Sequence, residues 1–297
     1  MRTLTDALRL GAVRFPRGTL RRKACIGSIK ILHRRPRLPP GLTEVRPLDR
    51  PHVSFEPTDS MVMDAIYWFG VQGYEGRMAD VWESLCATAH NIIEVGANVG
   101  LFTVLGGLCA RGSYTAVEPL PEVADVLRRN LARNRLSAAI DVRQAAAVAN
   151  PSDTPVEISI PNEGRSAPVG AHLTLGTEVT GRSSFRTISV PSIAFANLIE
   201  RATLIKIDAE GIEAELLQSA LGCVAQNKPT IVIEVLPNSS KLAALISHIA
   251  SKYGYTIHVI PAYGSDEIVV VRHEEFGPRT PWQRNSKDVV LAQRSLF

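Results

Sequence analysis

The stretch from residue 91 to residue 105 constrains the fold of this chain most strongly, because an apolar strand there runs into a glycine turn. Residues 91–95 (NIIEV) are almost continuously apolar, which is typical of a strand buried on both faces. Gly96 and Gly100 lie in the turn, and apolar residues recur at helical spacing beyond Gly100. A strand, a tight turn and a helix N-terminus together form the nucleotide-binding corner of a doubly wound α/β sheet.

The spacing of the two glycines narrows the class of nucleotide. Gly96 and Gly100 give Gly-x-x-x-Gly rather than the Gly-x-Gly-x-x-Gly fingerprint of dinucleotide-binding folds. This difference favours S-adenosylmethionine over a hydride-transfer cofactor. Glu94 lies at the end of the first strand, and Glu118 follows the next predicted strand, about 20 residues after the turn. We expect Glu118 to accept hydrogen bonds from both ribose hydroxyls; the alternative is a solvated charge at a strand end.

Predicted strands and helices alternate through the rest of the chain. Strands are expected at 91–95, 113–117, 139–143, 203–207 and 230–235, and helices at 60–69, 77–87, 99–109, 121–133, 211–220 and 239–252. Two later strands, 255–260 and 267–271, are separated by a short loop, which is typical of an antiparallel hairpin. We therefore predict a doubly wound, mostly parallel seven-stranded sheet with an antiparallel edge hairpin, the Rossmann-like architecture of class I methyltransferases.

A second group of acidic residues follows two of the predicted strands. Asp208 and Glu210 come directly after strand 203–207, and Glu234 lies at the end of strand 230–235. Ligands of open α/β sheets bind outside the carboxyl ends of the strands, so one of these acids is a candidate general base. The acids are equally suited to binding a divalent cation. A third possibility is that one of them pairs with Lys206, since a buried lysine needs a partner.

Two further acids begin the helix that follows. Glu213 and Glu215 lie where negative charge favours the positive end of the helix dipole. We expect them to stabilise the helix start rather than to take part in catalysis.

The region between the two halves of the predicted sheet is long and polar. Residues 156–160 and 186–190 are strand-like and bracket a segment with several glycines, including residues 162–181. A connection of this length is typical either of a binding loop or lid, or of a disordered segment.

Composition and cysteine content limit the classes of protein. Of the 297 residues, 45% are hydrophobic and 21% are charged, which is typical of a globular protein with an ample core. The sequence contains no run of 18 apolar residues, so we expect no transmembrane helix. Four scattered cysteines lack the spacing of a zinc site and indicate reduced thiols in the cytoplasm.

Residues 1–50 are strongly basic. They hold thirteen Lys or Arg and three acidic residues, with basic clusters at 21–23 and 34–37. These clusters could bind phosphate or an anionic membrane. We favour a solvated, partly disordered extension with a proline-rich linker, because basic runs are commonly solvated, and without an uninterrupted apolar core it is a poor secretory signal. We therefore expect a basic extension over 1–50 and one catalytic domain over 51–297.

Five motifs occur in order along the chain: residues 94–103 (EVGANVGLFT), 117–121 (VEPLP), 130–134 (NLARN), 204–213 (LIKIDAEGIE) and 229–235 (PTIVIEV). Together they resemble the FkbM family of S-adenosylmethionine-dependent methyltransferases. The resemblance covers roughly residues 74–235, and residues 288–292 look like the final strand of the family. An ordered set of motifs is much more specific than one glycine turn.

The resemblance implies O-methylation of a hydroxyl group, usually on a sugar or secondary metabolite, with a small molecule or glycan as acceptor. It places the cofactor's ribose at Glu118, its adenine near Ala145 and Ala146, and Tyr74 and Glu75 over the cofactor. The amino-acid end of the cofactor would contact Glu94, Gly96, Asn98 and Gly100.

The chain departs from the family at three places. Glu94 stands where the family usually has Asp, which preserves the charge. Residues 192–195 (SIAF) stand where a Leu-Asp pair is common. The family's substrate loop of the Asn-x-Gly-x-Ser type is retained loosely as Asn162, Arg165 and Ser166.

Two other functions compete with an O-methyltransferase. A nucleic-acid methyltransferase would explain the basic first fifty residues, but no nucleic-acid-binding module is recognisable and aromatic residues make up only 6% of the chain. A non-catalytic adenosyl-binding partner protein is the second alternative. The acids at three strand ends count against it.

Overall fold

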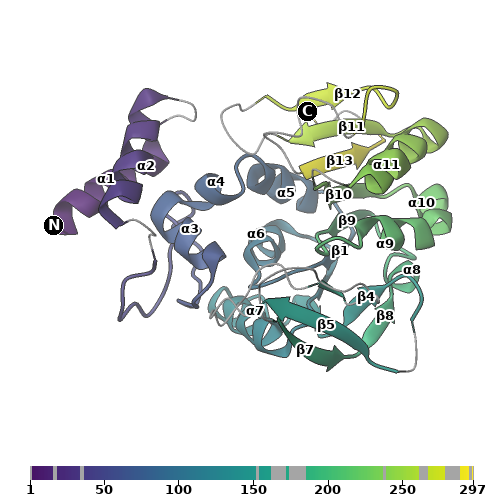
Figure 1. Cartoon of the computed structure of the whole chain (residues 1–297), viewed down its shortest axis with the longest axis horizontal. Helices are drawn as coiled ribbons and strands as arrows, with labels where there is room; N and C mark the ends of the chain where they lie inside the picture. The colour runs from purple at the N-terminus through teal and green to yellow at the C-terminus, as the bar shows by residue number, and fades with distance from the viewer. Residues whose placement is uncertain are drawn as a thin grey trace.

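The central element of the structure, a computed structural model, is an eight-stranded sheet (Figure 1). The structure describes residues 2–15, 19–33, 37–151, 154–161, 172–173, 185–236, 239–260, 267–277, 288–293 and 296. Within these residues the strand order of the sheet is β12-β11-β13-β10-β9-β1-β2-β3. The strands are β1 (Asn91–Val95), β2 (Ser113–Val117), β3 (Ile140–Arg143), β9 (Leu204–Ile207), β10 (Thr230–Glu234), β11 (Thr256–Ile260), β12 (Val269–Val271) and β13 (Asp288–Ala292).

The direction of the strands confirms the predicted mostly parallel sheet. Strands β10, β9, β1, β2 and β3 run parallel, whereas β13 is antiparallel to both of its neighbours. The predicted hairpin of β11 and β12 is antiparallel and lies at the edge. The described sheet has one strand more than the seven expected, because β13 inserts between β10 and β11. Every residue of β13 is buried, as befits an interior strand.

Helices cover both faces of the sheet, as expected of a doubly wound fold. Ile92 of β1 belongs to one core, and its neighbour Ile93 belongs to the other, because successive strand residues face opposite sides. The first core is covered by α3 (Met61–Phe69), α5 (Met78–Cys86), α6 (Leu101–Cys109) and α7 (Pro121–Arg133). The second is covered by α8 (Phe195–Leu198), α9 (Glu213–Ser219), α10 (Leu221–Asn227) and α11 (Ser240–Tyr253).

The polar region between the two halves of the sheet forms small sheets of its own. β4 (Ala146–Val148) pairs in parallel with β8 (Ser192–Ala194). β5 (Val156–Pro161) pairs antiparallel with β7 (Phe185–Val190), so the two bracketing segments expected to be strands do pair. Two residues of β6 (His172–Leu173) add to the edge of β5. The candidate substrate-loop residues Asn162, Arg165 and Ser166 lie outside the described residues.

The first helices correct the expectation of a partly disordered extension. α1 (Arg2–Arg14) and α2 (Leu20–His33) pack against each other and project from the side of the molecule beside α3 (Figure 1). Arg9 donates to the carbonyl of Tyr67 in α3 at 2.9 Å, and its guanidinium lies 3.6 Å from the centre of the Tyr67 ring. We call α1 and α2 together the N-terminal hairpin.

Residues between the hairpin and α3 belong to the main core. Val45 exchanges backbone hydrogen bonds with Phe55, and both side chains are fully buried. The carboxylate of Asp49 accepts from the backbone N–H groups of Val71 and Gln72, at the start of α4 (Val71–Tyr74). A boundary at residue 50 would separate these partners. None of the helices that the structure describes is long and apolar enough to cross a membrane.

Candidate functional site

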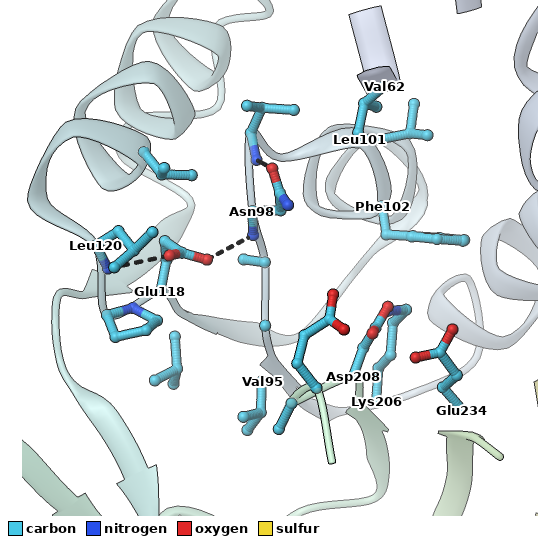
Figure 2. A pocket seen from close by; sticks show the side chains of 18 of the residues that line it. Val62, Val95, Asn98, Leu101, Phe102, Glu118, Leu120, Lys206, Asp208 and Glu234 are labelled. Atoms are coloured by element: carbon cyan, nitrogen blue, oxygen red, sulfur yellow. Dashed lines mark hydrogen bonds and ion pairs between the residues drawn. The ribbon is translucent and has the colours of Figure 1, made fainter. Parts of the chain in front are cut away.

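A cavity of about 290 Å³ lies at the carboxyl ends of the parallel strands (Figure 2). It opens beyond β1, β2, β9 and β10, at the place where the chain returns from β3 to pair β9 beside β1. This reversal of strand order is where open α/β sheets bind ligands, and the volume is near the lower end for small-molecule sites. Glu118 lies at one end, and Asp208 and Glu234 lie at the other (Figure 2).

Gly96 lets two strand ends approach each other at the floor of the cavity. Its φ is +82°, and a Cβ on it would lie 1.8 Å from the carbonyl oxygen of Asp208. The requirement for glycine therefore comes from the neighbouring backbone. Gly100 does not line the cavity; a Cβ there would lie 2.4 Å from Cδ1 of Leu127 in α7. Gly100 thus permits α6 to begin close to α7 rather than forming part of the cavity wall.

Glu118 is held at the cavity by two backbone donors. One carboxylate oxygen accepts from the N–H of Asn98 at 2.8 Å, and the other accepts from the N–H of Leu120 at 3.0 Å (Figure 2). Burial raises the pKa of Glu118 to about 7, although both hydrogen bonds favour the charged form. Each oxygen retains lone-pair capacity, so Glu118 can accept further hydrogen bonds from a ligand.

Asn98 shapes the turn between β1 and α6. Its φ is +50°, a left-handed conformation that Asn tolerates better than most residues, and its side-chain oxygen accepts from the N–H of Val99 at 2.7 Å. Asn98 therefore fixes the turn locally while its own N–H holds Glu118. Asn98 also lines the cavity.

The structure places Glu94 behind the cavity rather than in it. Glu94 is buried and is not among the residues that line the cavity. The same carboxylate oxygen accepts from the hydroxyl of Thr103 at 2.8 Å and from that of Tyr114 at 2.5 Å. Burial raises the pKa of Glu94, while the nearby charge of Lys206 opposes that rise. The geometry assigns Glu94 to a buried polar cluster that braces β1 against β2 and α6.

Lys206 pairs with Asp208 at the floor of the cavity. The Nζ of Lys206 lies 2.8 Å from a carboxylate oxygen of Asp208 and 4.6 Å from the centre of the Phe102 ring. Burial lowers the pKa of Lys206, but the attraction of Asp208 and Glu94 outweighs this and raises it above its usual value. Of the roles left open for the strand-end acids, pairing with Lys206 is therefore realised by Asp208.

Glu210 and Glu234 also line the cavity. Glu210 has a φ of +52°, and the backbone around it is held by Glu213, whose carboxylate accepts from the N–H groups of Ala209 and Gly211. Glu213 was expected only to stabilise a helix start; its hydrogen bonds show that it also fixes the loop carrying Glu210. Among the residues the structure describes, no group of three or more His, Cys, Asp or Glu side chains is placed to hold a metal ion.

The remaining residues predicted to contact the cofactor differ in whether they line the cavity. Tyr74, Glu75 and Ala145 line the cavity. Ala146 does not line it; this residue is buried in β4, where its N–H donates to the carbonyl of Pro191. Ala147 lines the cavity in its place, which the alternation of a strand from Ala145 could have indicated. Other apolar lining residues were missed because they lie far apart in sequence: Val62, Leu101, Phe102, Val123 and Leu236.

The part of the chain that supplies most of the cavity also matches a protein-family model. The family model of the methyltransferase FkbM domain matches residues 94–257, which span β1 to β11 and include Glu118, Asp208 and Glu234. No curated protein matches the chain.

Several solved structures are similar to the chain in fold. The methyltransferase FkbM from Methylobacillus flagellatus KT shares 19% identity at a TM-score of 0.40, over 68% of this chain and 43% of that chain. This chain thus spans less than half of that protein. The O-methyltransferase from Bacillus cereus, in complex with SAH, shares 13% identity at a TM-score of 0.40, over 73% and 78%. The SAM-dependent methyltransferase from Agrobacterium tumefaciens shares 11% at 0.47, over 86% and 72%.

Proposed function

The chain belongs to the FkbM methyltransferase family, and from this premise we propose that it is an S-adenosylmethionine-dependent O-methyltransferase. Its acceptor would be a hydroxyl of a sugar or secondary metabolite. The observation that carries the proposal is a single cavity with the Glu118 carboxylate at one end and Asp208, Glu210 and Glu234 at the other. Such a cavity offers separate places for binding a nucleoside and for reacting an alcohol.

The chemistry of the cavity wall fits an adenosyl group. The Glu118 carboxylate can accept hydrogen bonds from ribose hydroxyls, and its orientation is fixed by the N–H groups of Asn98 and Leu120. Val95, Val117 and the neighbouring Ala145 and Ala147 supply small apolar surface suited to a flat, uncharged base, as do Pro119 and Leu120. We propose that these residues hold the adenosyl end of the cofactor.

The opposite end of the cavity carries the acids proposed for catalysis. When bound, S-adenosylmethionine supplies an electrophilic methyl group. Lys206 pairs with the Asp208 carboxylate and fixes its direction, and a carboxylate in this place could accept a proton from an attacking hydroxyl. We rank Asp208 first as general base, then Glu210, with Glu234 at the end of the adjacent strand. Orientation of the two reactants in the cavity would supply most of the acceleration.

We also propose that the protein acts in the cytoplasm on a small-molecule or glycan acceptor. All four cysteines carry free thiols, which agrees with a reducing cytoplasm. A small-molecule or glycan acceptor suits a cavity of this size better than a duplex nucleic acid, which binds over a much larger surface.

The proposal is tested with methyl-labelled S-adenosylmethionine and three acceptor panels: sugars, hydroxylated secondary metabolites and RNA. We expect label in the first or second panel. Label in RNA alone would indicate the nucleic-acid alternative, and cofactor binding without transfer to any panel would indicate a non-catalytic adenosyl-binding protein.

The same assay tests the general base. Asp208→Asn, Glu210→Gln and Glu234→Gln are each measured for turnover and for cofactor affinity by calorimetry. The base variant should lose about 10²–10⁴-fold in turnover while cofactor affinity stays nearly constant. Glu215→Gln, at an acid on α9 that does not line the cavity, is the matched control. Equal turnover in all four variants would contradict a role for these carboxylates.

A further inference from the structure

The N-terminal hairpin presents an apolar face that no part of the described chain covers. Leu20 is 84% exposed and Ile31 is 80% exposed. Together with Ala24 and Gly27 they occupy positions i, i+4, i+7 and i+11 of α2, which lie on one side of a helix. A Cβ on Gly27 would meet no atom within 4 Å, so there is open space beside this residue. We call these four residues the α2 outer face.

The inward side of the same helix already has its partners. Ile29 is fully buried in a small core with Ala12 of α1 and Trp68 of α3. Cys25 packs toward Gly11, where an added Cβ would lie 2.5 Å from the Cys25 sulfur. The exposed residues of the α2 outer face therefore add nothing to the packing of the hairpin. Their hydrophobicity requires a separate explanation.

Basic side chains flank the α2 outer face. On the helix, Lys23 and Lys30 lie along one border of the face and Arg21 lies along the other, and all three are exposed. No ion pair within the described part of the chain involves Lys23 or Lys30. Over residues 2–33 the sequence has eight Lys or Arg and one acid, Asp6. An apolar stripe bordered by lysines and arginines is typical of helices that lie in the surface of an anionic bilayer.

We propose that the N-terminal hairpin binds an anionic membrane surface, with Leu20 and Ile31 inserted at the level of the headgroups. Charge complementarity selects this occupant: the hairpin is strongly basic, whereas residues 51–297 hold 20 Lys or Arg against 26 acids. A second hairpin of the same sign would be repelled. A nucleic acid would use the lysines but leave the two aliphatic side chains in water.

The hairpin is attached to the rest of the structure through the end of α3. Arg9 of α1 donates two hydrogen bonds to the Tyr67 carbonyl, and Trp68 packs against Ala12 and Ile29 of the hairpin. Both contacts fall on the last turn of α3, whose first turn contributes Val62 to the cavity. Binding at the α2 outer face would therefore hold the domain at the membrane through α3.

Co-sedimentation of the full chain with vesicles tests the proposal. Vesicles of phosphatidylcholine alone are compared with vesicles in which phosphatidylglycerol makes up about one third of the lipid. We expect binding only to the anionic vesicles, weakened by added salt. Lys23→Gln with Lys30→Gln should weaken it about 25-fold, at roughly fivefold per cation. Leu20→Gln with Ile31→Gln should weaken it about tenfold or more.

Matched controls separate the hairpin from the rest of the surface. Leu108→Gln removes a 43% exposed leucine of α6, and Lys241→Gln with Lys252→Gln removes two exposed lysines of α11; neither should change binding. Circular dichroism and cofactor affinity confirm that each variant is folded.

Equal binding to neutral vesicles, no vesicle binding, or full binding by the Leu20→Gln, Ile31→Gln variant would overturn the proposal. Self-association abolished by that variant, without vesicle binding, would also overturn it and make the face an interface between copies. Binding to RNA in place of vesicles would overturn it in favour of a nucleic-acid partner.

Discussion

Of the glycines that the structure describes, Gly96 leaves the least room for a side chain. Gly96→Ala would place a methyl group against the Asp208 carbonyl in a left-handed conformation, so we expect a loss of at least about 2 kcal/mol in the free energy of unfolding. Gly222→Ala is the matched control, because a Cβ there meets nothing within 4 Å and α10 favours alanine. Urea unfolding of both variants measures the difference. Equal stability of Gly96→Ala and the parent chain would contradict the close approach of β1 and β9.

Glu118 should make stability depend on pH. Its pKa is raised by burial from 4.5 to about 7, so the folded chain favours the protonated acid. The resulting stabilisation is fully present below about pH 4.5 and is lost as pH rises through about 7, a change of ~3 kcal/mol. Urea unfolding of the parent chain and of Glu118→Gln, each from pH 4.5 to 8, isolates this contribution. Parallel pH profiles for the two chains would show that Glu118 has an ordinary pKa.

Of the two strand-end acids predicted to contact the cofactor, the structure places Glu118 at the cavity and Glu94 behind it. Both are acids near a strand end, yet Glu118 follows its strand and reaches the cavity, whereas Glu94 shares the face of Ile92 and points into the core. The two-residue alternation within β1 could have distinguished them. The pairing of Lys206 with Asp208 could be anticipated from the cost of a buried lysine, but its contact with Phe102 depends on tertiary packing.

At the scale of elements, the sequence pattern predicted those strands and helices whose formation depends on neighbouring residues. Strand β1, the glycine turn and α6 follow from continuous hydrophobicity and glycine spacing, and they form as predicted. The insertion of β13 between β10 and β11 depends on pairing across a long sequence separation, which periodicity does not report. The helices of the N-terminal hairpin were not predicted for the same reason: its basic residues look solvated in the sequence, whereas Arg9 is held by Tyr67 in α3.

The N-terminal hairpin should be separable from the catalytic domain. A chain beginning at Arg37 keeps the Trp68 contact, the Val45–Phe55 pair and the Asp49 cap, so we expect it to fold and to bind cofactor like the full chain. A chain beginning at Pro51 loses all three contacts and should melt at a lower temperature. Thermal unfolding and calorimetry compare the three chains. Loss of cofactor binding in the chain from Arg37 would show that the hairpin belongs to the catalytic domain.

In the whole molecule, the cavity lies where the order of the strands reverses, between β1 and β9. The side chains at its two ends differ in chemical character. One end has a fixed carboxylate among small apolar residues; the other has acids and the Lys206 ion pair. A dinucleotide site would require a second nucleotide to occupy the acidic end, where its phosphates would meet carboxylates. The arrangement therefore favours a cofactor that carries positive charge at that end.

Calorimetric titration of the full chain with S-adenosylmethionine and with NAD tests this account most directly, because it needs no knowledge of the acceptor. We predict binding of S-adenosylmethionine at one site, no binding of NAD, and an affinity for S-adenosylmethionine weakened by ~1.5–3 kcal/mol in Glu118→Ala. Asp125→Ala, at an exposed acid of α7, should leave that affinity unchanged. Binding of NAD without binding of S-adenosylmethionine would contradict the assignment of the cavity to a methyl donor.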